Sequence, residues 1–337
     1  MRTIGQWIAL KLRTIVGYKR GGGGFLSACA IMRSIYVQIP AYRDEELFPT
    51  VVSLLSAAIR PDRLRIGVAW QYGPDEEGLE KDLRRVPGVD IVKIPAAASR
   101  GCNWARGLLQ ARAGDERYTL LLDSHHRFAP GWDEATVDMF EDLRSVDCQK
   151  PILSGYLPPY RPESDPAGRV DAIYTMREAE RCDGLLFRLV GDAVRDRAAM
   201  QKPFPGAFAS LHFLFADSVF NREVPADPAI YFFADEVAIG LRAFTHGYDV
   251  FQPHRVLGWH QYDRSHRVPH WRDHPGWRRL NRLSLARLRA LYSGAACGRH
   301  GIGSARSIAA FEARAGFRLI GSGGAVPRPA SMLDPRQ

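Results

Sequence analysis

From residue 34 to residue 122 the chain alternates apolar strands with helices, and this alternation constrains the fold more than any other feature. Strands are expected at 34–39, 64–70, 89–94 and 118–122, with helices between them at 47–59, 74–86 and 102–113. Strands that alternate with helices form a parallel sheet covered by helices. The sequence therefore predicts a nucleotide-binding α/β architecture. The absence of a GxGxxG pattern after the first strand disfavours a dinucleotide-binding protein.

Beyond residue 150 the pattern is less regular. Further strands are expected at 152–156, 185–190, 209–216, 248–252 and 256–259, and helices at 235–246 and 279–291. The second of these helices is basic and amphipathic. It could pack on the domain or contact an acidic partner or a lipid surface.

The strand at 118–122 ends abruptly in three polar residues, Asp123, Ser124 and His125. Ligands of open α/β sheets bind at the carboxyl ends of strands. Asp123 and His125 are two residues apart, so they share one face of an extended segment. A carboxylate oxygen and an imidazole nitrogen could hold a divalent cation, Mn²⁺ better than Ca²⁺. The alternative is a strand end at which Asp123 caps a turn and His125 is exposed.

Composition bounds the class of protein. With 337 residues and 46% hydrophobic content, the chain can bury a substantial core. There is no run of about 18 apolar residues that would span a membrane and no secretory signal. Five cysteines without a CxxC pair indicate free thiols in a reducing compartment. We expect a cytoplasmic location.

The net charge of +9 is concentrated at the two ends of the chain. Residues 1–33 carry +6 and residues 277–337 carry +9, which leaves the middle with −6. This predicts a basic N-terminal segment (1–33), a catalytic domain (34–276) and a basic helical C-terminal extension with a frayed tail (277–337). Basic ends favour peripheral contact with an anionic partner such as the inner membrane face, and no nucleic-acid partner is expected.

Within the N-terminal segment, residues 4–16 read as a basic amphipathic helix of the kind that lies in a membrane interface. An ordinary packed helix and a disordered leader are the alternatives. Residues 21–24, all glycine, read as a hinge or linker.

Five short motifs resemble, in order, those of a GlcNAc-transferase family typified by the cytoplasmic Skp1 hydroxyproline N-acetylglucosaminyltransferase. They lie at 99–106, 123–128, 232–236, 245–248 and 259–262, within a region of resemblance from about 34 to 265. The resemblance implies a GT-A-like glycosyltransferase fold, with a single Rossmann-like nucleotide-binding domain and a mixed central sheet. It also implies a metal-dependent, retaining enzyme that uses a UDP-sugar donor, UDP-GlcNAc above all.

The resemblance further implies a metal site. Asp123 and His125 stand where most GT-A enzymes carry Asp-x-Asp, and His260 matches the family's late histidine. The three residues would hold Mn²⁺ or Mg²⁺ on the UDP diphosphate and neutralise the charge that develops on departing UDP. For His260 the alternative is a core histidine.

Nucleotide contacts are expected at the end of the first strand and at the start of the helix at 102–113. Helix N-termini favour anions and guanidinium groups suit phosphate, although a helical arginine is often merely solvated. Tyr42 could stack on uracil. The candidate nucleotide-binding residues are Pro40, Tyr42, Arg43, Asp44, Arg100, Trp104, Arg106 and Ser124.

Asp235 and Glu236 are the candidate catalytic acids. The family pattern here is similar to Gly-Glu-Glu, from which this chain departs at Ala234 and Asp235. Either acid could bind the acceptor hydroxyl or stabilise a positive anomeric carbon, and both could simply cap the helix. Front-face attack by the acceptor, with departing UDP as the base, is expected rather than a double displacement.

His266, His270 and His274 recur every four residues, but Pro269 and Pro275 interrupt a helix there, so we expect a polar loop near the site. The predicted function is transfer of a sugar, most simply GlcNAc, from a UDP-sugar to a hydroxyl acceptor on a protein or glycan. The alternative is a catalytically silent UDP-sugar-binding protein of the same fold.

Overall fold

The computed structural model describes residues 34–145, 148–196, 200–232, 234–265 and 267–321. The predictions for the segments at 4–16 and 21–24, for the tail beyond 321 and for His266 fall outside these residues. Among the described residues, no helix is both long enough and apolar enough to cross a bilayer.

The centre of the described structure is an eight-stranded sheet with the order β3-β2-β1-β4-β10-β6-β11-β9. Its first half is parallel, and consists of β1 (Ile35–Tyr42), β2 (Leu64–Tyr72), β3 (Val89–Pro95) and β4 (Tyr118–Leu122). The second half contains β6 (Pro151–Ser154), β9 (Phe204–Pro205), β10 (Phe213–Asp217) and β11 (Asp249–Gln252). Because β10 runs antiparallel to both β4 and β6, the sheet is mixed, as predicted.

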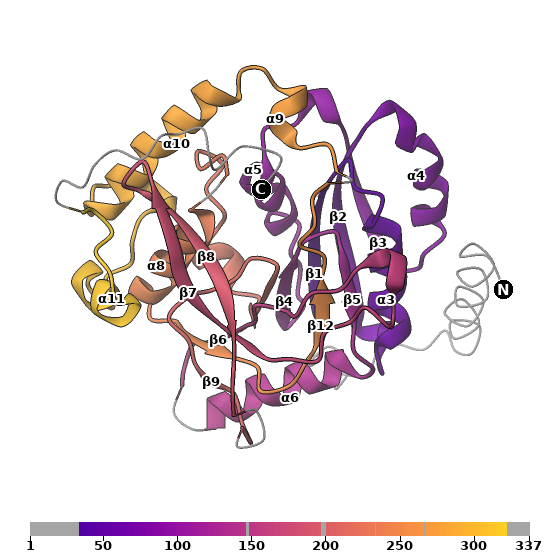
Figure 1. Cartoon of the computed structure of the whole chain (residues 1–337), viewed down its shortest axis with the longest axis horizontal. Helices are drawn as coiled ribbons and strands as arrows, with labels where there is room; N and C mark the ends of the chain where they lie inside the picture. Colours follow the sequence, from indigo (N-terminus) through magenta and orange to yellow (C-terminus); the bar gives the residue numbers. More distant parts are fainter. Residues whose placement is uncertain (1–33, 146–147, 197–199, 233, 266, 322–337) are drawn as a thin grey trace.

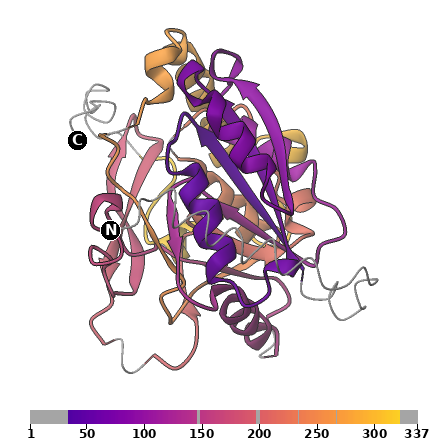
Figure 2. The same ribbon diagram turned by 90° about the vertical axis from the view of Figure 1, so that its right-hand side faces the viewer.

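Helices cover both faces of this sheet (Figures 1 and 2). Alternate apolar residues of β1 and β4 pack in one cluster with α3 (Leu47–Ala57) and α6 (Trp132–Ser145), whereas α5 (Cys102–Gln110) lies against β1 and β2. The second half is covered by α8 (Asp235–Thr245), which packs on β11. The other α-helices of the described residues are α4 (Glu77–Arg84), α7 (Phe220–Glu223), α9 (His270–Asp273), α10 (Trp277–Tyr292) and α11 (Ile308–Ala315).

A second hydrophobic cluster joins the C-terminal helices to a hairpin in front of the sheet (Figure 1). The hairpin consists of β7 (Tyr174–Cys182) and β8 (Leu186–Ala193). Phe187 of the hairpin, Leu288 of α10 and Phe311 of α11 are all buried in this cluster. The helices beyond residue 276 therefore pack on the rest of the fold.

Two expectations of extended backbone need correction. The strand predicted at 209–216 begins only at Phe213, because Ser210 leaves the ladder: its N–H donates to Ser154 Oγ and its hydroxyl lies beside His212. The segment 123–125, expected to be extended, is a bend between β4 and β5.

Candidate active site

A short two-stranded sheet beside the main one assembles the site. It consists of β5 (His126–Phe128) and β12 (Gly258–His260), paired antiparallel so that His260 lies opposite His126. A Cβ atom at Gly258 would lie 2.6 Å from the carbonyl oxygen of Arg127, so only glycine permits this close approach of the two strands. This pairing places His260 beside the segment that follows β4, although the two are far apart in the sequence.

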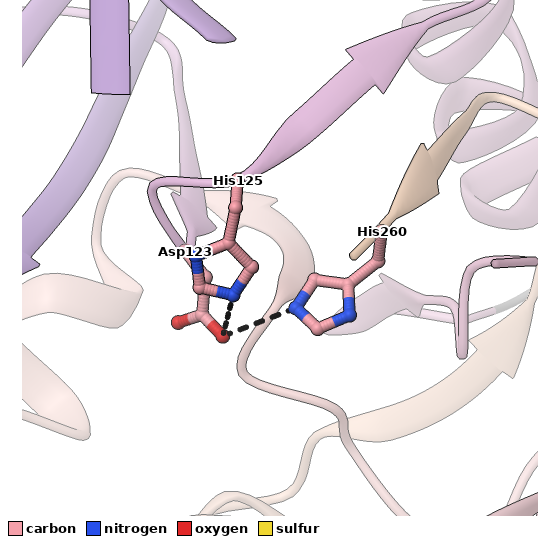
Figure 3. Close-up of side chains that lie close together, drawn as sticks. All are labelled: Asp123, His125 and His260. Atoms are coloured by element: carbon pink, nitrogen blue, oxygen red, sulfur yellow. Dashed lines mark ion pairs between the residues drawn. The ribbon is translucent and has the colours of Figure 1, made fainter. Parts of the chain in front are cut away.

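Asp123, His125 and His260 converge at the carboxyl end of β4 (Figure 3). One ligand atom from each residue lies within 4.8 Å of the other two. Asp123 Oδ2 is 3.5 Å from His260 Nε2 and 3.9 Å from His125 Nε2. The bend at 123–125 turns the two side chains toward each other, so this convergence does not depend on the alternation of a strand.

These residues fit a divalent cation. His260 is buried, and among the described residues neither of its ring nitrogens has a hydrogen-bond partner. Such an orphaned buried group calls for an explanation. Burial and the neighbouring His212 hold the pKa of His260 well below its usual value, so the ring is neutral and keeps a nitrogen lone pair. One carboxylate oxygen and two imidazole nitrogens suit Mn²⁺ and similar metals.

Arg106 connects this cluster to the candidate catalytic acids. Its side chain is only 4% exposed, and its guanidinium lies 3.1 Å from both Asp123 Oδ1 and Asp235 Oδ2. Burial alone would raise the pKa of Asp123, but His260 and Arg106 outweigh it and hold that pKa well below its usual value. Arg106, expected on the diphosphate, thus lies between two carboxylates.

The two acids open α8 but have different surroundings. Ala234, just before them, has φ of 61°, a left-handed conformation that glycine adopts more easily than alanine. Glu236 Oε1 accepts hydrogen bonds from Ser210 Oγ at 3.0 Å and from the Leu211 N–H at 3.1 Å. Burial and the charge of Asp235 raise the pKa of Glu236 to about 7.

This raised pKa predicts a pH-dependent stability. As the pH rises from about 4.5 to about 7, the unfolded chain loses the Glu236 proton while the folded chain keeps it, so stability falls across this window. In Glu236→Gln, thermal unfolding should show a smaller loss of Tm between pH 5 and pH 7.5 than in the parent. The exposed Glu163→Gln variant should follow the parent, and an unchanged slope in Glu236→Gln would contradict the expectation.

The remaining nucleotide candidates lie in different surroundings. Tyr42 and Arg43 both contact Asp273 of α9, with O–H and N–H donors 2.7 and 2.8 Å from Oδ2. Arg100 is exposed over the Trp104 ring, 5.7 Å from its centroid. Two other candidates are buried. Pro40 lies within β1, and Ser124 Oγ lies 2.6 Å from Asp44 Oδ2 and 3.4 Å from His125 Nδ1.

Sequence reasoning missed two residues beside the cluster of Asp123, His125 and His260. The Arg267 guanidinium nitrogen NH1 lies 2.7 Å from His125 Nδ1 and 2.8 Å from its Nε2. His212 stacks on His260, with ring centroids 4.4 Å apart. The only signals for them were the histidine-rich loop around Arg267 and a histidine within an apolar strand.

The histidine-rich segment was expected to be a loop, but His270–Asp273 form the short helix α9, which begins directly after Pro269 because proline is tolerated at a helix start. His270 contacts Tyr231 through Nδ1 and Ser99 through Nε2, at 2.6 and 2.9 Å. His274 Nε2 lies 3.0 Å from the Ala96 carbonyl oxygen. Both histidines therefore pack over the loop that precedes α5.

Solved structures with the same architecture are glycosyltransferases of the GT-A type. GalNAc-T7, in complex with UDP, GalNAc and Mn²⁺, is 15% identical with a TM-score of 0.53, over 68% of this chain and 44% of that chain. TarS 1–349 from S. aureus is 9% identical with a TM-score of 0.50, over 84% of this chain and 69% of that chain. The chain thus spans less than half of the GalNAc-T7 chain, and these likenesses establish the fold.

The sequence itself gives the family. The model of the family described as Glycosyltransferase (GlcNAc) matches residues 34–85 and 75–319, and the chain belongs to this family. The match extends into the helices that follow residue 276. No curated protein matches the chain.

Proposed function

We propose that this chain is a metal-dependent, retaining glycosyltransferase that transfers GlcNAc from UDP-GlcNAc to a hydroxyl group of a glycan or protein, as the resemblance to hydroxyproline N-acetylglucosaminyltransferases suggests. The observation that carries the proposal is the convergence of Asp123, His125 and His260 at the carboxyl end of β4. Family membership supports it, as does the presence of UDP and Mn²⁺ in the GalNAc-T7 complex of the same fold.

In this proposal Asp123, His125 and His260 hold the cation on the donor diphosphate. The cation, Mn²⁺ or Mg²⁺, would neutralise negative charge on the departing UDP. Arg106 keeps Asp123 in place through its ion pair, and the same guanidinium fixes Asp235. The guanidinium of Arg106 is shielded from water, which strengthens its interaction with both carboxylates.

The two acids have separate roles in the proposal. Asp235, which shares Arg106 with Asp123, faces the donor and stabilises positive charge at the anomeric carbon. Glu236, held by Ser210 and Leu211, orients the acceptor side of the site. Neither acid is assigned as a covalent nucleophile, so retention follows from front-face attack. The anomeric configuration of the product, read by NMR, tests this: an inverted product would contradict it.

The test of the function is UDP release from a panel of UDP-sugars with Mn²⁺, with and without EDTA. Turnover of UDP-GlcNAc that requires the metal supports the proposal. Preference for UDP-Glc or UDP-Gal would show that the donor is a different UDP-sugar. The departure from Gly-Glu-Glu at Ala234 and Asp235 favours a second candidate, a silent UDP-sugar-binding protein. Metal-dependent UDP binding, without turnover on any acceptor offered, would favour that candidate.

We further propose a cytoplasmic enzyme whose basic C-terminal part, from residue 277, contacts the inner membrane face. Four exposed arginines of α10, Arg278, Arg279, Arg282 and Arg289, make no ion pair within the described part of the chain. Leu283 among them is 54% exposed. An unpaired cationic face with an apolar side chain suits anionic lipid.

Flotation with vesicles tests this contact. The parent should float with phosphatidylglycerol vesicles at low salt, whereas the Arg279→Glu/Arg282→Glu variant should float several-fold less. Phosphatidylcholine vesicles are the control, since they lack the negative charge. Equal flotation of parent and variant, or none by the parent, would remove the membrane proposal.

A further inference from the structure

Asp44 lies in the loop after β1 and is almost completely buried, with 2% exposure. Its Oδ2 accepts hydrogen bonds from Ser124 Oγ at 2.6 Å and from His125 Nδ1 at 2.7 Å. Its Oδ1 accepts from the Glu46 N–H at 3.0 Å. Both carboxylate oxygens are thus engaged by the protein itself.

The contact with Asp44 fixes which nitrogen of His125 faces the cluster. A carboxylate accepts only from a protonated ring nitrogen, so in the neutral ring that a metal ligand requires, Nδ1 carries the hydrogen and Nε2 keeps the lone pair. Nε2 is also the atom on the side of Asp123 Oδ2.

We infer that Asp44 is a positioning residue, which orients the ring of His125 so that Nε2 is presented to the metal, and that it does not contact the nucleotide. The inference rests on the proposed function and deepens it. Histidine ligands of metals commonly donate their other N–H to a carboxylate, which sets the ring orientation and raises the basicity of the ligand. A nucleotide hydroxyl would instead have to displace Ser124 or Glu46 from a buried carboxylate.

Asp44→Asn is the sharpest variant, because it keeps the shape of the side chain. The amide has one oxygen and one NH₂ group, whereas the three groups that hydrogen-bond to the Asp44 carboxylate are all donors, and Arg267 lies 3.6 Å from its Oδ2. Either the Glu46 N–H or the Ser124 and His125 pair must then face NH₂. If the NH₂ group faces the Glu46 N–H, the loop after β1, which holds the new amide, shifts. If it faces Ser124 and His125, the ring of His125 loses its fixed orientation.

The experiment measures Mn²⁺ affinity from the loss of the EPR signal of free Mn²⁺, with saturating UDP, and UDP affinity by calorimetry. Asp44→Asn should weaken Mn²⁺ binding by about 10- to 100-fold, the usual effect of losing such a partner. Asp133→Asn is the matched control. Asp133 is 3% exposed and accepts only from the Ile59 and Arg60 N–H groups among its described contacts, so this variant should bind Mn²⁺ as the parent does.

A spectroscopic readout separates positioning from a general loss of structure. In two-bond ¹H–¹⁵N spectra of the chain without metal, His125 should show the Nδ1–H tautomer in the parent and a tautomer mixture in Asp44→Asn. Unchanged Mn²⁺ affinity with weakened UDP binding would make Asp44 a nucleotide ligand and overturn the inference alone. A parent chain that binds neither Mn²⁺ nor UDP would overturn the proposed function as well.

Discussion

Asp123→Ala is expected to lower kcat/KM for sugar transfer at least about 100-fold, because even the loss of a group behind a metal ligand costs about 10- to 100-fold. Asp123 supplies the only carboxylate of the three-residue cluster, and its Oδ2 faces both histidines. The measurement is kcat/KM for UDP-GlcNAc over a range of Mn²⁺ concentrations. The variant should remain nearly inactive at Mn²⁺ concentrations that saturate the parent.

The control for this variant is Asp90→Ala. Asp90 is 43% exposed and pairs with Arg112 across 3.7 Å. It lies on β3, which is the edge strand of the main sheet, whereas Asp123 follows β4. Its removal should leave turnover unchanged. If Asp123→Ala retained parental kcat/KM and metal dependence, the assignment of the metal site to the end of β4 would be wrong.

Arg106→Met is expected to destabilise the fold by about 3 kcal/mol, since removing one partner of a buried ion pair leaves the other charge uncompensated. Here one side chain, 4% exposed, serves two carboxylates, whose side chains are 29% and 17% exposed for Asp123 and Asp235. Chemical denaturation gives the free energy of unfolding. Arg106→Lys should be intermediate, because an ammonium keeps the charge but loses the planar fork that reaches both acids.

Arg112→Met tests whether burial of the ion pair is the cause of the expected destabilisation. Arg112 is 48% exposed in its pair with Asp90, and such exposed pairs contribute about 0–1 kcal/mol. If Arg106→Met and Arg112→Met lowered the free energy of unfolding by similar amounts, the burial of Arg106 would not strengthen its ion pairs, and the expectation would be wrong.

Local patterns in the sequence predicted much of the fold, and the reason is periodicity. The strand at Tyr118–Leu122 was predicted with its observed bounds, and the helix that begins at Asp235 ends one residue before its predicted end. Each of these segments is identified by its own apolar spacing and by the polar residues that end it. The hairpin of β7 and β8 was only half predicted, because β7 is rich in charged residues and pairs only with β8 within the described chain.

The candidate site divides in the same way. The sequence by itself determined the Asp-x-His segment at the end of a buried strand, which is a local motif with its own chemistry, whereas the late histidine and the pair of acids followed from the resemblance to a glycosyltransferase family. Only the tertiary structure decided that Arg106 lies between Asp123 and Asp235 and that Asp44 lies behind His125. These contacts join residues up to 129 positions apart, and no local pattern encodes which side chains meet when strands of a sheet come together.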